Sequence, residues 1–194
     1  MKPQLKPAAF LDRDGVICEY VDHLHRIEDF KLRPNVGEAI RQLNGAGFWV
    51  FVITNQPMIA KGLLTIEGLE QIHHRMVDEL SHLGACIDSI QFCPHSPGGI
   101  IEPWNLDCGC RKPKAGMIEK LCQAFPIDLK RSFVAGDTWR DVQLAQSLNL
   151  FNYGVTGGAG FPYPPDHPQH AVKPNLIVDS LLMAVNHRLS SSQV

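Results

Sequence analysis

Residues 8–16 read AAFLDRDGV, a short apolar run that ends in two carboxylates, Asp12 and Asp14, and a glycine. The apolar run predicts a buried strand, and Gly15 predicts that a turn follows it. Residues two apart in a strand point to the same side, so both carboxylates are expected to face one way. Such a pair repels itself unless a cation intervenes, and oxygen ligands favour Mg²⁺. A solvated strand-to-turn junction would give the same letters, so the motif needs support from the rest of the chain.

Further apolar runs alternate with longer amphipathic stretches, which is typical of βα units wound into a parallel sheet. Strands are expected at residues 8–12, 49–54, 90–93, 132–135, 151–155 and 175–178. Helices are expected at residues 36–46, 66–83, 115–125, 139–147 and 180–189. The pattern predicts an α/β fold, a Rossmann-like doubly wound parallel sheet with helices on both faces.

Two inserts interrupt this alternation, at residues 17–32 and 94–114, and a Gly/Pro-rich loop covers residues 157–174. The inserts are too small to fold independently. In a doubly wound sheet, ligands bind outside the carboxyl ends of the strands. The polar residues that close the strands are therefore the candidate site residues.

The second and fourth strands end in residues suited to a phosphate and a metal ion. Thr54, Asn55 and Gln56 offer a hydroxyl and two amides, although threonine before a turn is also a common turn residue. Asp137 follows a glycine and could complete the magnesium site. Asp141 has two interpretations: a carboxylate that supports this site, or an acid favoured by the dipole of the following helix.

Arg111 and Lys112 place two positive charges just before a predicted helix. Positive charge at this place suits a phosphate group and the charge that develops on it in a transition state. A solvated basic turn is the alternative.

Three cysteines and a histidine cluster between the third strand and this basic pair, at Cys93, His95, Cys108 and Cys110. Three thiolates and one imidazole form a closed tetrahedral ligand set, which predicts structural rather than catalytic Zn²⁺ in a loop spanning residues 93–110. Chance clustering is the alternative. The remaining cysteines lie apart, and we expect two of them, Cys86 and Cys122, to be core residues.

Composition limits the classes of partner. The formal net charge is −2, and no basic stripe occurs, which argues against nucleic acid and membrane surfaces. No secretory signal precedes the first strand, and the longest apolar stretch, residues 47–53, is far shorter than the ~18 residues of a membrane span. We therefore expect one domain over residues 1–194, monomeric and cytoplasmic, that binds a small phosphorylated metabolite.

Taken in order, D-R-D-G-V, T-N-Q, R-K-P and G-D-x-x-x-D resemble the four motifs of the haloacid dehalogenase (HAD) phosphatase superfamily. The C-x-H…C-x-C insert is similar to that of the branch containing heptose 1,7-bisphosphate phosphatases and histidinol-phosphate phosphatases. The resemblance covers roughly residues 8–155. It implies a Mg²⁺-dependent phosphatase that removes the 7-phosphate of a heptose bisphosphate, with histidinol phosphate or another small sugar phosphate as the alternative substrate. It also implies a minimal cap made only of short loop inserts, because relatives of this branch lack a large cap domain.

The same resemblance implies the role of each site residue. Asp12 would be the nucleophile, and Asp14 the acid that protonates the leaving alcohol and then activates water. Mg²⁺ would lie among the Asp12 carboxylate, the Asp14 backbone carbonyl and Asp137. Thr54 and Lys112 would hold the transferring phosphoryl group, and Arg111 would contact the substrate or its phosphate. Asn55 and Gln56 are expected among the residues that bind the substrate or its phosphate.

Several departures from the branch concern substrate contacts, among them Cys18 and Thr138. Cys18 stands where these phosphatases usually have Asn, and Thr138 stands where they have Lys. Two further interpretations are a catalytically silent zinc-bearing interaction domain and a phosphatase that processes nucleic-acid ends. The intact carboxylates and Lys112 argue against the first, and the nearly neutral charge argues against the second.

Overall fold

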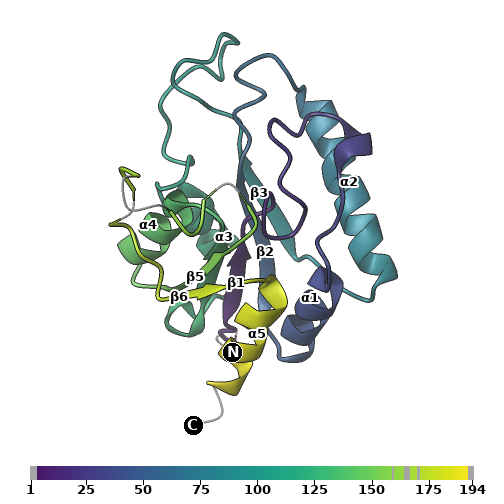
Figure 1. Cartoon of the computed structure of the whole chain (residues 1–194), viewed down its shortest axis with the longest axis vertical. Coiled ribbons are helices and arrows are strands. Elements are labelled where there is room, and N and C mark those ends of the chain that lie inside the picture. Colours follow the sequence, from purple (N-terminus) through teal and green to yellow (C-terminus); the bar gives the residue numbers. More distant parts are fainter. Residues whose placement is uncertain (1–3, 159, 164–166, 170, 192–194) are drawn as a thin grey trace.

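A parallel sheet forms the centre of the molecule in the computed structural model, which describes residues 4–158, 160–163, 167–169 and 171–191 (Figure 1). The strands are β1 (Ala8–Leu11), β2 (Trp49–Asn55), β3 (Ser89–Cys93), β4 (Phe133–Gly136), β5 (Phe151–Val155) and β6 (Leu176–Val178). Their order across the sheet is β3-β2-β1-β4-β5-β6, and each neighbouring pair is parallel. The predicted strands are confirmed, each to within one residue at either end.

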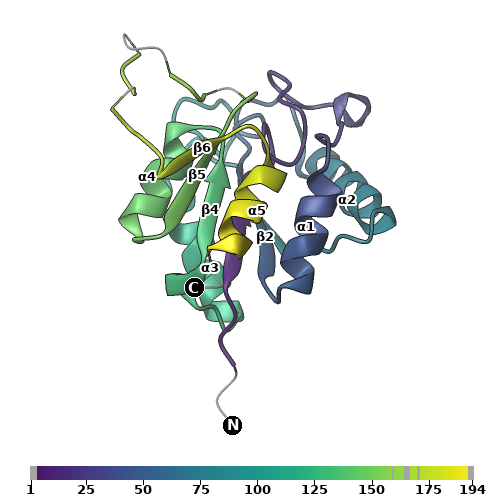
Figure 2. The same cartoon turned by 60° about the horizontal axis from the view of Figure 1, so that its bottom comes forward.

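Helices cover both faces of this sheet (Figure 2). They are α1 (Val36–Gly45), α2 (Ile66–His82), α3 (Gly116–Ala124), α4 (Trp139–Ser147) and α5 (Leu181–Ser190). The alternation of side chains along β1 sets the two layers of the core. Ala9 and Leu11 pack in the cluster that contains residues of α1, α2 and α5, whereas Ala8 and Phe10 pack with α3 and α4. The predicted fold class is therefore confirmed.

The strand order places a topological switch point between β1 and β4. The chain leaves β1 for β2 and β3 and then crosses back to β4 on the other side of β1. Leu11 pairs with Ala135, and the Asp12 amide donates to the Ala135 carbonyl at 2.9 Å. Because loops leave a switch point in opposite directions, a ligand crevice opens there. The residues that follow β1 and β4 are thus brought together.

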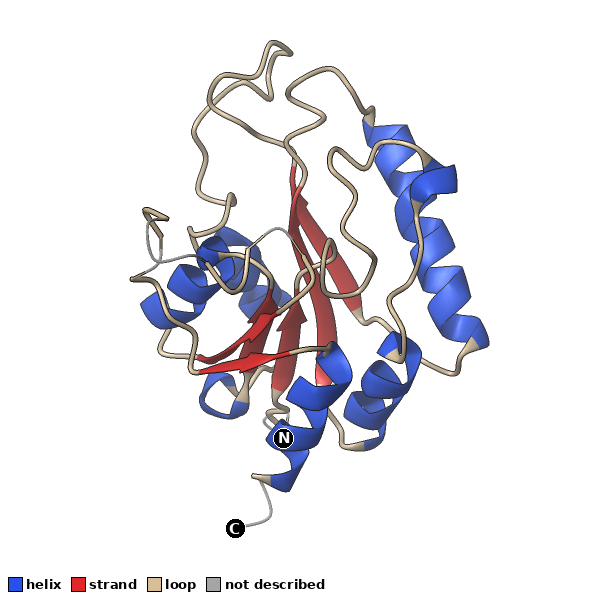
Figure 3. Ribbon diagram, viewed as in Figure 1, coloured by secondary structure: helices blue, strands red, loops and turns tan. Residues whose placement is uncertain are grey.

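Loops rather than a second domain lie over this end of the sheet (Figure 3). The insert at residues 94–114 has no helix or strand, and the first insert has one turn of 3-10 helix, Ile27–Asp29. This is the minimal cap that was predicted. Within the Gly/Pro-rich loop 157–174, residues 159, 164–166 and 170 lie outside the described residues.

One prediction about the core is wrong. Cys86 and Cys122 are exposed rather than buried. Cys86 lies in the turn between α2 and β3, and Cys122 follows the buried Leu121 on α3 and so points away from the sheet. Among the described residues, no helix has the length and apolar character needed to cross a bilayer.

Candidate active site

Asp12 lies directly after β1, and the buried Lys112 is held beside it. The Lys112 ammonium is 2.8 Å from Asp12 Oδ2 and 2.6 Å from Asp141 Oδ1, and it also donates to the Ile53 carbonyl at 3.0 Å. Burial opposes the charged ammonium, but the two carboxylates outweigh it and raise the pKa of Lys112. Lys112 is therefore a fixed positive charge with all three of its protons engaged.

Three buried carboxylates lie close together at the ends of β1 and β4. Asp12, Asp137 and Asp141 each offer an oxygen, and these oxygens lie within 4.8 Å of one another. Burial raises the pKa of Asp12 well above its usual range; Lys112 opposes this rise, while Asp141, Asp137 and Asp14 add to it. One ammonium thus leaves the cluster short of positive charge. An oxygen-rich, anionic site of this kind fits a hard divalent cation.

Asp141 serves two purposes, so both interpretations of its sequence position describe it. Its Oδ2 accepts hydrogen bonds from the Thr138 hydroxyl at 2.8 Å and the Thr138 amide at 3.2 Å, which closes the capping box at the start of α4. Its Oδ1 accepts from Lys112. The helix cap and the site charge are therefore the same side chain.

The Asp14 carboxylate lies outside the three-carboxylate group, because it is turned toward Arg13. Arg13 Nε donates to Asp14 Oδ1 at 3.1 Å, and Nη2 donates to Oδ2 at 2.9 Å. The amide of Gln56 also donates to Oδ2 at 3.0 Å. Asp14 still lines the cavity that contains Asp12. The cation that pairs with Asp14 is thus the guanidinium of Arg13, the preceding residue in the chain.

The three polar residues at the end of β2 are used differently. Thr54 lines the cavity, and its Oγ1 accepts from Gln56 Nε2 at 2.9 Å. Asn55 forms two hydrogen bonds with the Lys112 backbone, at 3.1 Å to its carbonyl and 3.0 Å from its amide. Gln56 is buried and bridges Thr54 and Asp14. Two of the three side chains therefore position other site residues.

The cavity over Asp12 has a volume of about 200 Å³ and shares part of its wall with a second cavity of about 370 Å³. The residues that line both are Asp14, Tyr20, Asn55, Pro57, Arg111 and Arg140. Lys61 and His23 line only the larger cavity. The site therefore has a small chamber with the carboxylates and a larger neighbour with several cations.

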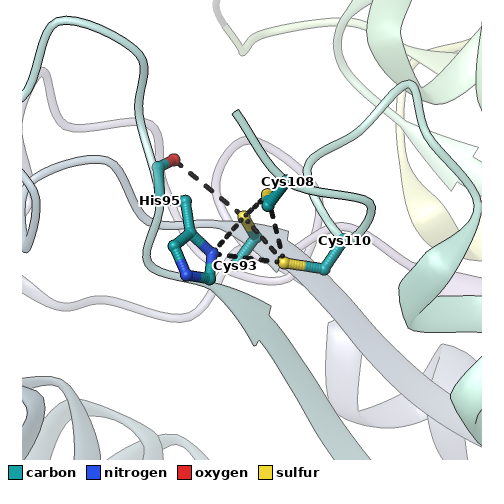
Figure 4. A group of neighbouring side chains, drawn as sticks. All are labelled: Cys93, His95, Cys108 and Cys110. Carbon is teal, nitrogen blue, oxygen red and sulfur yellow. Dashed lines mark hydrogen bonds between the residues drawn. The ribbon is translucent and has the colours of Figure 1, made fainter. Parts of the chain in front are cut away.

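The cysteine and histidine side chains gather beside this site and point toward one another (Figure 4). The sulfurs of Cys93, Cys108 and Cys110 are 3.2–3.4 Å apart, and His95 Nδ1 is 3.4 Å from Cys110 Sγ. Four such donors around one point match the ligand set of a structural zinc site. The next residue, Arg111, donates to the His95 carbonyl at 3.0 Å, so the cluster is tied to the cavity wall.

Comparisons with known proteins identify the family. The HAD-hydrolase-like family profile matches residues 109–184. D-glycero-beta-D-manno-heptose-1,7-bisphosphate 7-phosphatase from Rhodopseudomonas palustris is 43% identical over 153 residues, which cover 78% of this chain and 84% of that one. D-glycero-D-manno-heptose-1,7-bisphosphate 7-phosphatase from Thermosynechococcus vestitus is 35% identical over 184 residues, or 93% and 94% of the two chains. The chain belongs to the HAD-like phosphatases.

The solved structures lead to the same family. D,D-heptose 1,7-bisphosphate phosphatase from B. bronchiseptica, in complex with magnesium and phosphate, is 27% identical, with a TM-score of 0.79 and coverage of 95% of this chain and 99% of that one. HAD-like phosphatases use Mg²⁺, and the carboxylate cluster of this chain has the chemistry to bind it. The predictions of the family and of a phosphatase are confirmed.

Sequence reasoning missed four residues of this HAD-like phosphatase site: Arg13, Tyr20, His73 and Arg140. Arg13 stands between the two carboxylates of the motif, and alternation along a strand turns its side chain away from theirs, toward the core. A buried arginine at this position was the available signal. Arg140 lies within G-D-x-x-x-D. No motif marks Tyr20, which lies in the insert directly after the first motif, or His73, which contacts Arg13 only through the packing of α2.

Proposed function

We propose that this protein is a magnesium-dependent phosphatase that removes the 7-phosphate of D-glycero-D-manno-heptose 1,7-bisphosphate. The names of the relatives support the substrate, and one observation of the site carries it. The cavity over Asp12 shares part of its wall with a cavity lined by Lys61, Arg111 and Arg140, none of which forms an ion pair with another described residue. A substrate with a second phosphate would supply the missing negative charge.

The chemistry proceeds in two halves. The Asp12 carboxylate attacks phosphorus, the bond from phosphorus to the sugar oxygen breaks, and Asp14 gives that oxygen its proton. Water then attacks the aspartyl phosphate, Asp14 takes a proton from it, and the bond between Asp12 and phosphorus breaks. The products are the alcohol and inorganic phosphate, and both aspartates return to their starting states.

Fixed positive charge supports both halves. Lys112 already contacts the nucleophile, and its pairing with Asp141 keeps it in place when the phosphoryl group arrives. Thr54 receives a hydrogen bond from Gln56, which leaves its hydroxyl proton for a phosphate oxygen. Mg²⁺ would be held by the Asp12 carboxylate, the Asp14 backbone carbonyl and Asp137, and it would neutralise phosphate and carboxylate charge.

The cations of the larger cavity form the second half of the proposed site. Burial lowers the pKa of Arg111, and the neighbouring Arg140 adds to this lowering by repulsion. Arg140 is held with its guanidinium 4.6 Å from the centre of the Trp139 ring. An anion bound between the two guanidinium groups would offset their mutual repulsion. Lys61, on the turn after β2, faces the same space.

Zinc would stabilise the loop that carries two of these groups. Cys93, His95, Cys108 and Cys110 hold the ion in this proposal, and the chain continues directly into Arg111 and Lys112. Residues 94–114 have no regular secondary structure, so metal ligation would supply the order that a core supplies elsewhere.

The function is tested by phosphate release in the presence of Mg²⁺ from heptose 1,7-bisphosphate, heptose 7-phosphate and histidinol phosphate. We expect the bisphosphate to give the highest kcat/KM, and we expect the heptose 1-phosphate to be the product. The variant Asp12→Asn serves as the control and is expected to show no turnover. A preference for histidinol phosphate would overturn the substrate, and full activity of Asp12→Asn would overturn the nucleophile.

A further inference from the structure

Arg13 has no exposed side-chain surface, which is unusual for an arginine that stands between two site carboxylates. Its guanidinium contacts two different side chains. Nε and Nη2 form the bidentate pair with Asp14, and Nη1 lies 3.3 Å from Nε2 of His73 on α2. No other described side chain contacts this guanidinium by a hydrogen bond. The chain of contacts therefore runs from α2 through Arg13 to Asp14.

The direction of the bond between Arg13 and His73 is fixed by chemistry. A guanidinium can only donate, so His73 Nε2 must accept, and the imidazole is neutral with its proton on Nδ1. Burial lowers the pKa of His73 to about 3, and the adjacent guanidinium adds to the lowering. His73 packs against Phe92 of β3, with the ring centres 5.8 Å apart. The acceptor is thus held rigidly from the helix and the sheet.

We infer that His73 is a positioning residue for proton transfer at Asp14, acting through Arg13. The inference rests on the proposed function, in which Asp14 first donates and then accepts a proton. A bidentate pair fixes the plane of a carboxylate only if the guanidinium is itself fixed. His73 supplies that restraint from the side opposite Asp14. Gln56 Nε2 and Cys18 Sγ contact the same carboxylate at 3.0 and 3.4 Å and complete its surroundings.

Loss of the restraint should affect the two halves of the reaction differently with different leaving groups. A sugar alkoxide is a strong base and needs the proton of Asp14, whereas p-nitrophenolate leaves without one. The second half needs Asp14 as a base whatever group has left. A misplaced Asp14 therefore slows both halves for a sugar phosphate and only the second half for p-nitrophenyl phosphate.

The test compares His73→Leu, which removes the acceptor, with His73→Gln, which keeps one. In His73→Leu we expect steady-state kcat to fall roughly tenfold or more for both heptose bisphosphate and p-nitrophenyl phosphate, within the range that general acid–base catalysis contributes. The first turnover of p-nitrophenyl phosphate should stay within about threefold of wild type and appear as a burst of nitrophenolate near one equivalent of enzyme. His73→Gln should recover most of the loss.

Other results would overturn the inference. A first turnover that slows as much as the steady state would mean a general structural role, and an unchanged His73→Leu would mean no role. If His73→Leu does not fold, His73→Asn has an amide too short to reach Nη1 and carries the same comparison. If wild type hydrolyses neither substrate, the proposed function fails and this inference fails with it. If wild type is active and His73→Leu is as active as wild type, only the inference fails.

Discussion

Lys112 is the positive charge that pairs with two of the three clustered carboxylates. It is buried and bonded to Asp12, Asp141 and the Ile53 carbonyl. We expect Lys112→Met to lower kcat about a hundredfold or more, because the phosphoryl group loses a preorganised charge. We also expect the free energy of unfolding to fall by about 3 kcal/mol, since two buried carboxylates are left uncompensated. Phosphate release and denaturant unfolding measure the two effects.

Lys114→Met is the matched control for this prediction. Lys114 stands two residues away and pairs with Asp107 at 2.7 Å, but both side chains are exposed. Exposed pairs contribute little, so activity and stability should stay near wild type. Equal losses in the two variants would contradict the role assigned to Lys112.

His73 also predicts how stability changes with pH. Its pKa is about 3 in the folded protein against 6.5 in an unfolded chain, so the unfolded state binds a proton that the folded state refuses. The free energy of unfolding therefore falls as pH drops below about 6, by up to ~1.4 kcal/mol per pH unit. His73→Gln has no imidazole to protonate at this position, so it lacks this loss of stability at low pH. Between pH 7 and pH 4 its stability relative to wild type should improve by about 2–3 kcal/mol.

The control for this pH dependence is the neighbouring residue of α2. His74 is exposed, so His74→Gln should follow the wild-type curve in urea unfolding at each pH. A His73→Gln curve that runs parallel to wild type from pH 7 to pH 4 would show that the imidazole is not protected from protonation.

These residues show how far sequence reasoning reaches at this scale. Asp12 and Asp137 could be predicted to meet, because each lies where a strand gives way to a loop. The contact between Arg13 and His73 could not, since 60 residues separate them and α2 reads as an ordinary amphipathic helix. Side chains that act through another residue carry no motif of their own.

At the scale of elements, the turn after β1 depends on Gly15. Its φ is +78°, and a Cβ added there would lie 2.5 Å from Asp137 Oδ2. Gly15→Ala should therefore displace Asp137 and lower kcat by about a hundredfold, in addition to a loss of about 1 kcal/mol of stability from the backbone strain. Gly47 provides the control, because its φ is also +78° and its Cβ would meet nothing within 4 Å.

Gly47→Ala should lose similar stability and keep full activity, as measured by thermal unfolding and phosphate release. If both glycine variants lose activity alike, strain rather than the contact with Asp137 explains the effect. The comparison separates two costs that a single substitution would combine.

The loop at residues 94–114 gives a prediction about metal removal. Cys108→Ser, or a chelator followed by restored Mg²⁺, should lower the zinc content of the purified protein and make this loop more sensitive to proteolysis. Arg111 is positioned by a hydrogen bond to the His95 carbonyl, so a disordered loop should misplace this proposed substrate contact. KM should therefore rise more than kcat falls. Cys122→Ser is the control, since this thiol is exposed on α3. Wild-type protein that contains no zinc would contradict the assignment.

At the scale of the whole molecule, the alternation of strands and helices was predictable, and the strand order then explains the site. The switch point between β1 and β4 places Asp12 and Asp137 side by side. The larger cavity was not predictable, because Lys61, Arg111 and Arg140 come from three separate segments. Arg111 was predicted to contact the substrate, but Lys61 and Arg140 look like ordinary surface charge in the sequence, and only the convergence of all three indicates a second anionic group on the ligand. The monomeric state and cytoplasmic location stay predictions.

That convergence leads to a prediction about substrate choice. Arg140→Ala should lower kcat/KM for heptose 1,7-bisphosphate about tenfold to a hundredfold, because a charged hydrogen bond to the second phosphate contributes about 1.5–3 kcal/mol. The effect on heptose 7-phosphate should be less than about threefold, since that substrate has no second phosphate to place. Lys61→Ala should show the same selectivity with a smaller effect, because Lys61 is exposed.

Lys130→Ala distinguishes this local contact from net charge. Lys130 lies in the short 3-10 helix Leu129–Arg131 before β4, at the other end of the sheet from the cavities. Its loss changes the net charge by the same amount, so it should leave the ratio of kcat/KM for the two substrates unchanged. If Arg140→Ala lowers both substrates equally, the guanidinium serves the transferring phosphoryl group, and the larger cavity is not where the second phosphate binds.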